Sequence, residues 1–180
     1  MTAKECITGR RSIRKFTSEP ISHEVLQSVV ETASYAPSWK NTQITRYIAV
    51  EDSALKSSIA KKATAAHPNN ANIINSAPIL IVVTMIKNRS GFERDGSFST
   101  AKGDRWQMFD AGIASEAFCL AAYEQGLGTV IMGIFDESVI GDLLAIPEDR
   151  EVAALIAIGH PDEAPQAPKR KTVEDLLSYQ

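Results

Sequence analysis

The sequence predicts one domain that combines helices with strands. Hydrophobic residues make up 44% and charged residues 23% of its 180 residues, which is typical of a folded globular protein. Short apolar, β-prone runs also alternate with longer segments of helical periodicity along the chain. Because no repeat, low-complexity run or linker divides the sequence, we expect a single domain over residues 1–180.

Four segments have the periodicity and end signals of helices, at residues 22–35, 53–66, 105–125 and 136–144. Ser22 and Asp136 are suitable N-caps, and Ile21 and Leu26 have the spacing of a hydrophobic staple. The second helix is expected to turn Leu55, Ile59, Ala63 and Ala66 inward and to end at His67–Asn70. Near the C-terminus, Thr172 can cap a final turn or two.

The segment 105–125 predicts an unusually apolar helix. Between Ala111 and Tyr123 its only charged residue is Glu116, so this helix is expected to be buried almost all round. One face carries Trp106, Phe109, Ile113, Ala117 and Leu120. Small residues would let another helix approach closely, namely Ala111, Gly112, Ala114, Ser115 and Ala117. In a chain of this length that helix can come from a second subunit, which is a first indication of a homodimer.

Four apolar runs predict strands, at Ile44–Val50, Pro78–Thr84, Thr129–Met132 and Val152–Ile158. Between the second and third of these lies Lys87–Arg105, which is rich in glycine, serine and charge. Such a segment predicts a long surface loop or lid, and loops of this length often serve function.

The beginning of the chain has no apolar signal region, and no apolar run approaches the ~18 residues of a membrane span, so we expect a cytoplasmic protein without a membrane partner. The two cysteines, Cys6 and Cys119, are far apart in the sequence and indicate neither a disulfide framework nor a metal site. We expect both to be reduced and structural.

The net charge of −3 is unevenly distributed. Two short stretches without an acidic residue hold seven of the basic residues: Arg10, Arg11, Arg14, Lys15, Lys169, Arg170 and Lys171. The remaining acidic surface would repel a nucleic acid, which is therefore not expected as a partner, whereas a small phosphate fits. Guanidinium groups match phosphate oxygens, and Ser12 can complete such a site. Solvated charged stretches near the chain ends remain the alternative.

A second candidate site is the loop Ala36–Gln43, which follows a helix and leads into a strand. Ser38, Asn41 and Gln43 offer donors and acceptors suited to the edge of a heterocycle, and Trp39 offers a flat apolar surface. An ordinary capped turn is the alternative. A third candidate, Gly126-Leu127-Gly128 with residues 129–133, permits close approach of a ligand, although a helix C-cap also explains its glycines.

No protein side chain is an evident catalyst. The three histidines, His23, His67 and His160, are dispersed, and no serine lies in a G-x-S-x-G turn. Neither GxGxxG nor GxxxxGK[ST] is present, so a Rossmann-type nucleotide site is not supported. This pattern suits a protein whose cofactor carries the reaction.

These segments, in this order, resemble the nitroreductase family over nearly the whole chain. Residues Arg10–Phe16 look like the family's opening phosphate motif, and Ala36-Pro37-Ser38 with Asn41 and Gln43 looks like its APS-x-x-N-x-Q loop. The other similar segments are Ser76-Ala77-Pro78, Asp110–Tyr123, Gly126-Leu127-Gly128, and Gly159-His160-Pro161 before Lys169-Arg170. Their joint order and spacing are specific, although Lys87–Arg105 matches no motif of the family.

The resemblance implies an α+β fold with a central, mostly antiparallel sheet surrounded by helices, and an intertwined homodimer that binds two FMN molecules at its interface. The FMN phosphate and the pyrimidine side of the flavin would be held by Arg10, Arg11, Ser12, Arg14, Lys169 and Arg170. The flavin ring would be lined by Pro37, Ser38, Trp39 and Asn41 of the other subunit. Met132 and Gly133 would approach it from the opposite side, and Asn69 and Asn72 are candidates for ribityl contacts.

The resemblance also implies a ping-pong reaction, in which NADH or NADPH reduces FMN and a small electron-poor acceptor, such as a nitroaromatic or a quinone, takes the electrons. Flavin N5 would carry this chemistry, so no catalytic side chain and no metal are assigned. The alternatives are a specialised flavoenzyme of the same fold, such as a dehalogenase or a flavin-fragmenting enzyme, a non-catalytic FMN-binding protein, and a non-flavin binder of phosphate ligands.

Overall fold

The computed structural model describes all residues 1–180 and contains the predicted mixture of helices and strands. In chain order its elements are α1 (Ala3–Gly9), α2 (His23–Ala33), the short turn η1 (Trp39–Asn41), β1 (Thr45–Val50), α3 (Ser53–Ala63), α4 (Pro68–Ser76), β2 (Ile79–Ile86), α5 (Arg105–Glu124), β3 (Gly128–Met132), α6 (Glu137–Leu144), β4 (Arg150–Gly159) and α7 (Val173–Leu176). All four predicted strands and all four predicted helices are present, with ends shifted by a few residues.

The four strands form one sheet in the order β1-β2-β4-β3, and every neighbouring pair is antiparallel. Strand β2 lies in the interior of the sheet, and its residues from Ile79 to Met85 are all buried. Alternate side chains of this strand enter two different cores: Leu80 and Val82 on one face, and Ile79, Ile81 and Val83 on the other. The expected antiparallel α+β sheet is confirmed.

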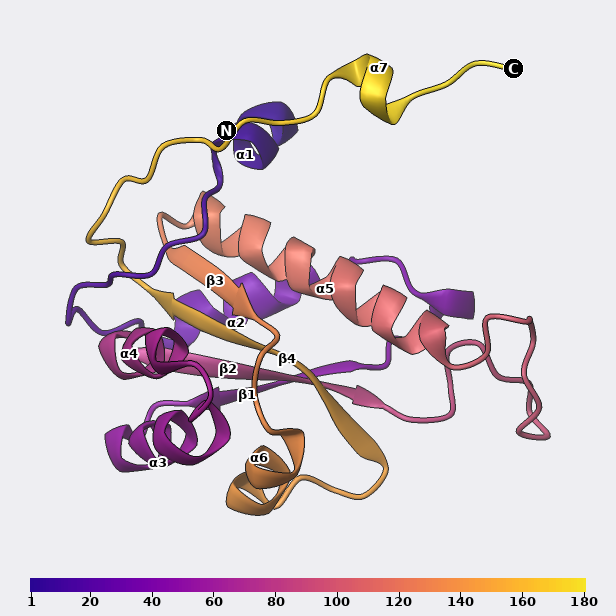
Figure 1. Cartoon of the computed structure of the whole chain (residues 1–180), viewed down its shortest axis with the longest axis horizontal. Helices are drawn as coiled ribbons and strands as arrows, with labels where there is room; N and C mark the ends of the chain where they lie inside the picture. The colour runs from indigo at the N-terminus through magenta and orange to yellow at the C-terminus, as the bar shows by residue number, and fades with distance from the viewer.

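Helices cover both faces of the sheet (Figure 1). Helices α3, α4 and α6 pack on the face that contains Leu80 and Val82, and α2 and α5 pack on the opposite face. The outer edge strands are β1 and β3. Both chain ends lie on the same side of the molecule, above α5 in this view, with the C-terminal tail passing α1 (Figure 1).

The capping predictions are confirmed. Ser22 accepts a hydrogen bond from the backbone N–H of Val25, and Asp136 accepts from Ser138 and Val139. Thr172 likewise caps the single turn of α7. No helix combines the length and the apolar character that crossing a lipid bilayer would require.

Two helices were not predicted, and one predicted inward position was wrong. Helix α4 begins at Pro68, where the sequence indicated only the end of the preceding helix, because proline also favours the first position of a new helix. Helix α1 is capped by Thr2. Since α3 ends at Ala63, Ala66 is exposed, whereas Lys56 is buried and its Nζ donates to the carbonyl oxygens of Ala77 and Pro78.

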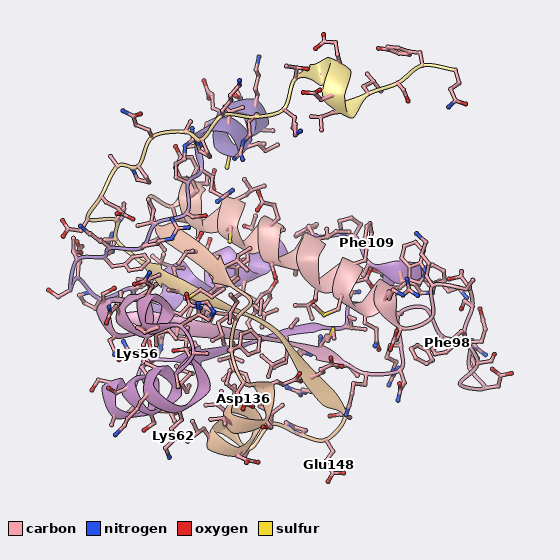
Figure 2. All side chains as sticks on the ribbon, viewed as in Figure 1. Lys56, Lys62, Phe98, Phe109, Asp136 and Glu148 are labelled. Carbon is pink, nitrogen blue, oxygen red and sulfur yellow. The ribbon has the colours of Figure 1, made fainter.

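The prediction that the helix at 105–125 is buried almost all round needs correction for a single chain. The buried face of α5 consists of other residues: Gln107, Asp110, Ala111, Ala114, Ser115, Phe118, Cys119, Ala121 and Ala122. On the face that carries Trp106, Phe109, Ile113, Ala117 and Leu120, Phe109 is 58% exposed and the other four are half-buried, and the neighbouring Met108 is 50% exposed. Figure 2 shows Phe109 pointing away from the sheet. Periodicity could not assign the sides because both are apolar.

Candidate functional site

The basic segment that follows α1 is packed against the sheet at β3. Ser12 forms a parallel bridge with Thr129, and the backbone N–H of Ile13 donates to the carbonyl of Thr129 at 2.9 Å. Ile13 and Phe16 are buried in the core between the sheet and α3, α4 and α6. Residues 12–16 are therefore packed down at Ile13 and Phe16, as their apolar character implied, while the side chains of Arg14 and Lys15 remain exposed.

The same segment runs beside the chain that leaves β4. Thr17 N–H donates to the carbonyl of His160 at 2.9 Å, Asp162 N–H donates to the carbonyl of Lys15 at 3.0 Å, and Phe16 bridges Pro161. The structure therefore brings residues 12–17 and 160–162 together, several residues before Lys169 and Arg170. Lys169 and Arg170 form no ion pair with any carboxylate.

Most of the cationic groups in this region are not neutralised. Arg10 Nε lies 3.3 Å from a Glu116 carboxylate oxygen, but it is a buried atom without a hydrogen bond of acceptable angle, so we regard the contact as an imperfect ion pair. Arg11 Nη1 donates to the carbonyl oxygens of Thr8 and Arg10. Arg11 and Arg14 have no carboxylate partner for their guanidinium groups. Such a set of donors suits an anion rich in oxygen, such as a phosphate.

Glu163 adds an acidic group that the sequence analysis did not single out. Its carboxylate accepts a hydrogen bond from the backbone N–H of Arg14. A backbone N–H of the basic segment thus already holds a carboxylate oxygen, which shows that an anionic group is accommodated there.

The loop at 36–43 is held by a buried carboxylate that the sequence analysis missed. The backbone N–H of Trp39 donates to both oxygens of Asp110, at 3.1 and 3.0 Å, and the hydroxyl of Ser90 donates to the same carboxylate. Within the loop, Ser38 Oγ accepts from the backbone N–H of Gln43 at 2.9 Å. An aspartate in a helix gives no sequence signal of such a role, since most helical aspartates face solvent.

An aromatic cluster lies over this loop. The rings of Trp39 and Trp106 are 4.8 Å apart, and those of Trp106 and Phe109 are 5.4 Å apart. A groove of about 240 Å³ beside them is lined by Pro37, Ser38, Trp39, Trp106, Phe109, Asp110 and Ile113. The expectation that Trp39 offers a flat apolar surface is consistent with this geometry.

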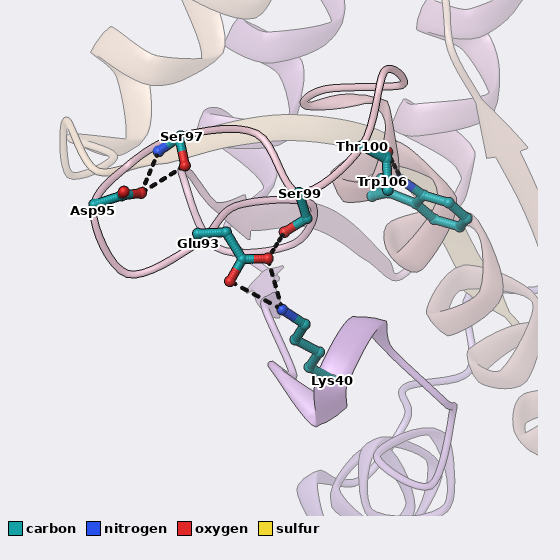
Figure 3. A network of polar contacts seen from close by, with 7 residues as sticks. All are labelled: Lys40, Glu93, Asp95, Ser97, Ser99, Thr100 and Trp106. Carbon is teal, nitrogen blue, oxygen red and sulfur yellow. Dashed lines mark hydrogen bonds and ion pairs between the residues drawn. The ribbon is translucent and has the colours of Figure 1, made fainter.

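The predicted surface loop at 87–105 is confirmed, and polar contacts attach it to the neighbouring turn (Figure 3). Lys40 Nζ donates to the Glu93 carboxylate at 3.0 and 3.2 Å, and Ser99 donates to the same group. These hydrogen bonds, from Ser99 first and then from Lys40, lower the pKa of Glu93. At the end of the loop, Trp106 Nε1 donates to Thr100 Oγ1 at 2.9 Å.

The glycines near β3 divide into two kinds. A Cβ at Gly128 would lie 2.8 Å from side-chain atoms of Ile13, and Gly126 has a φ of +78°, so both have a structural reason that needs no ligand. A Cβ at Gly133 would meet nothing within 4 Å, which leaves open space at the end of β3. The neighbouring side chain of Met132 is buried in the core, so this residue can meet a ligand only through its backbone.

The asparagines of α4 differ in their contacts. Asn70 Nδ2 donates to the carbonyl of Ile134 at 3.2 Å, next to Gly133. Asn69 and Asn72, the two candidates for ribityl contacts, are exposed and make no side-chain hydrogen bond within the chain. Asn70 is therefore the residue that ties α4 to the segment after β3.

The two parts of the candidate site lie towards opposite ends of α5. Asp110 in its second turn holds Trp39, whereas Tyr123 in its last turn lies against Gly9. Thirteen residues of helix separate the two positions, which corresponds to ~20 Å along the axis. Within one chain, the Trp39 loop and the start of the basic segment therefore do not enclose one cleft.

Comparisons with known proteins agree on one family. Residues 7–160 match the model of the nitroreductase family. The NADPH-flavin oxidoreductase of Vibrio harveyi is 29% identical over 168 residues, which cover 92% of this chain and 68% of that protein.

Solved structures give the same result. A nitroreductase family protein from Clostridium novyi NT is 32% identical, with a TM-score of 0.76 over 89% of this chain and 87% of that one. An FMN-dependent nitroreductase from Clostridium difficile R20291 is 26% identical, with a TM-score of 0.74 over 96% and 94% of the two chains. From the family model, these similarities and the antiparallel α+β fold, we conclude that the chain belongs to the nitroreductase family.

Proposed function

We propose that this chain is an FMN-dependent NAD(P)H oxidoreductase and that residues 1–180 form one FMN-binding domain. The observation that carries the proposal is the packed basic segment at 10–14, whose guanidinium groups have no adequate carboxylate partner. The names of its relatives support it, since they include an NADPH-flavin oxidoreductase and an FMN-dependent nitroreductase.

The residues present fit FMN. The guanidinium of Arg10, which has only the imperfect contact with Glu116, and the unneutralised guanidinium groups of Arg11 and Arg14 are suitable donors to its phosphate, and the open space at Gly133 leaves room for its ring system. When bound, FMN supplies hydride transfer at N5, from NADH or NADPH and onward to an electron-poor acceptor such as a nitroaromatic or a quinone.

The side chains of the protein bind and orient the cofactor. Arg10, Arg11, Ser12 and Arg14 would hold the phosphate and the pyrimidine side, together with Lys169 and Arg170. Cations near the pyrimidine side favour the anionic reduced flavin. Pro37, Ser38, Trp39 and Asn41 would line the ring. Met132 through its backbone, and Gly133, would approach from the opposite side.

A homodimer would complete the cleft. Because the Trp39 loop and the basic segment lie towards opposite ends of α5, a second copy can bring the loop of one protomer to the basic segment of its partner. The exposed residues Met108 and Phe109 on α5 offer apolar area for that contact. The C-terminal tail offers further apolar area for the contact between protomers. Four of its large apolar side chains are exposed in the single chain, namely Val173, Leu176, Leu177 and Tyr179.

Purified protein tests the cofactor assignment. We expect a yellow protein whose flavin absorbance bleaches on anaerobic addition of NADH or NADPH and returns when a quinone is added. R10A and R170A should each weaken FMN binding, whereas K61A, at an exposed position on α3, serves as a matched control. Unchanged FMN affinity in both arginine variants would reject the phosphate assignment, and bound flavin that NAD(P)H never bleaches would indicate a non-catalytic FMN-binding protein.

Light scattering tests the assembly. The expected mass is about twice the 19.6 kDa of one chain. A strictly monomeric protein that still binds FMN would contradict the shared cleft.

A further inference from the structure

Asp110 is a buried carboxylate without a cation beside it. It is 3% exposed, and no lysine, arginine or histidine forms an ion pair with it. Burying an unpaired charge is costly unless hydrogen bonds satisfy it. The partners of Asp110 are the backbone N–H of Trp39 and the hydroxyl of Ser90, so its surroundings are arranged around these two donors.

The direction of the hydrogen bonds in this network can be assigned. Ser90 has a single hydroxyl hydrogen, which it donates to Asp110, because an ionised carboxylate can only accept. The contact of 2.7 Å between the hydroxyls of Thr42 and Ser90 must therefore have Thr42 as its donor. Asp110 thus holds the loop twice, directly at Trp39 and through Ser90 at Thr42.

The held segment has an unfavourable backbone. Lys40, Asn41 and Gln43 have φ values of 45°, 55° and 48°, in the left-handed region that residues other than glycine rarely adopt. Such a conformation is unfavourable and persists only where surrounding contacts impose it. The bonds from the Trp39 N–H to Asp110 and from the Thr42 hydroxyl to Ser90 are part-buried contacts that reach this turn from outside it.

We propose that Asp110 is a positioning residue, which fixes the 38–43 turn in the shape that receives the flavin ring. This inference rests on the proposed function, because the turn is assigned there to the flavin. Asp110 acts through Trp39 and Thr42, and its role is to supply hydrogen-bond acceptors at fixed points rather than negative charge.

Replacing Asp110 with asparagine separates the contribution of the hydrogen bonds from that of the negative charge. In D110N an oxygen at the position of Oδ2 can accept from both the Trp39 N–H and the Ser90 hydroxyl, so Thr42 stays the donor to Ser90 and only the second, bifurcated bond from Trp39 to Oδ1 is lost. The geometry of the network survives without the charge. In D110A neither hydrogen bond can form, and two buried donors lose their acceptor.

The experiment measures FMN release on serial dilution of FMN-saturated protein, with the D142A variant, at an exposed position on α6, as control. We expect D110A to raise the dissociation constant of FMN about tenfold or more, D110N by less than about threefold, and D142A not at all. Both tryptophans of the chain lie at this turn, so quenching of their emission by FMN gives a second readout without turnover. It should weaken in D110A and return in D110N.

The possible results distinguish a positioning role of Asp110 from a role of its charge and from no role in FMN binding. A folded D110A that binds FMN as tightly as the wild type would overturn the proposal, and so would a D110N variant as impaired as D110A, since that pattern indicates a role for the charge. If D110A does not fold, T42V decides, because it removes only the outer hydroxyl of the network: a few-fold weaker FMN binding supports positioning, and no change rejects it. Wild-type protein that binds no FMN would instead refute the proposed function.

Discussion

The two ends of α5 hold the candidate site by different means. At its N-terminal end, buried hydrogen bonds connect Asp110 and Ser90 to the turn that carries Trp39. At its C-terminal end, the basic segment is held by its backbone and by apolar side chains: Ile13 N–H donates to Thr129, and Ile13 packs against Gly128. The hydrogen bonds of its arginine side chains go to nearby carbonyls of residues 8–12, and only the imperfect contact between Arg10 and Glu116 reaches α5.

The difference follows from what each end has to bind. A guanidinium that is to receive a phosphate cannot also be neutralised by the fold, so main chain and apolar packing must position the segment instead. A turn that presents an aromatic face needs no free charge, and buried polar groups can fix it. The predictions below test this contrast, from the largest expected effect to the smallest.

Adding a methyl group at Gly128 should be the most damaging of these changes. Its Cβ would lie 2.8 Å from Ile13 Cβ, an atom that no side-chain rotation can move away. We expect G128A to lower the free energy of unfolding by about 1–3 kcal/mol, measured by chemical denaturation.

Gly133 provides the matched control, because a Cβ there meets nothing within 4 Å. We expect G133A to change the stability of the FMN-free chain by less than about 0.5 kcal/mol and yet to weaken FMN binding. If G128A were as stable as the wild type, the basic segment would not depend on packing, and the contrast between the two ends of α5 would be wrong.

Elements with strong local signals could be predicted from the sequence. The strand at 79–86 is a continuous apolar run, and Ser22 and Asp136 mark helix starts because their side chains cap neighbouring N–H groups. Helix α4 was missed because its Pro-Asn-Asn start has the composition of a turn. Sequence periodicity also could not say which apolar face of α5 meets the sheet.

The candidate site was predictable where it is local in sequence and not where it depends on tertiary contacts. The basic segment and the 36–43 loop could be recognised as motifs. Asp110 and Ser90 could not, since they meet Trp39 only after the chain folds and stand 71 and 51 positions from it in the sequence. Whether Lys169 and Arg170 reach the phosphate stays a prediction.

Tyr47 should show a moderate effect that depends on pH. Its hydroxyl donates to the carbonyl of Ala114 in the middle of α5, and burial, with a smaller contribution from Cys119, raises the pKa of Tyr47 from 10.0 to about 12. The folded state therefore favours the neutral phenol. Its stabilisation is fully present below pH 10 and is lost as the pH rises through the folded pKa, because the unfolded chain ionises first.

We expect Y47F to cost about 1 kcal/mol at neutral pH, where the hydrogen bond is lost, and to lose less stability than the wild type between pH 10 and 12. Denaturant unfolding curves of both proteins, recorded across that pH range, would show this smaller loss. Burial also raises the pKa of Cys119 to about 11. The wild type and Y47F therefore share the loss of stability that ionisation of this thiol causes, and only the difference between their profiles reports on Tyr47. Identical pH profiles would contradict a half-buried, neutral Tyr47, and Y35F, at an exposed tyrosine, is the control.

The contact between Lys40 and Glu93 should show the smallest effect, because both side chains are exposed and surface ion pairs contribute little to stability. We expect E93Q to leave the melting temperature unchanged and to speed tryptic cleavage after Arg94 in the 87–105 loop. D95N is the matched control, since Asp95 bonds only Ser97 within its own turn.

The contact also depends on pH. Because folding lowers the pKa of Glu93 below its ordinary value of 4.5, the contact is fully present above pH 4.5 and weakens as the pH falls through the folded pKa. Cleavage of E93Q at the wild-type rate would mean that the loop is held by Trp106 and its neighbours alone, and the N-terminal end of α5 would then owe its order entirely to buried contacts.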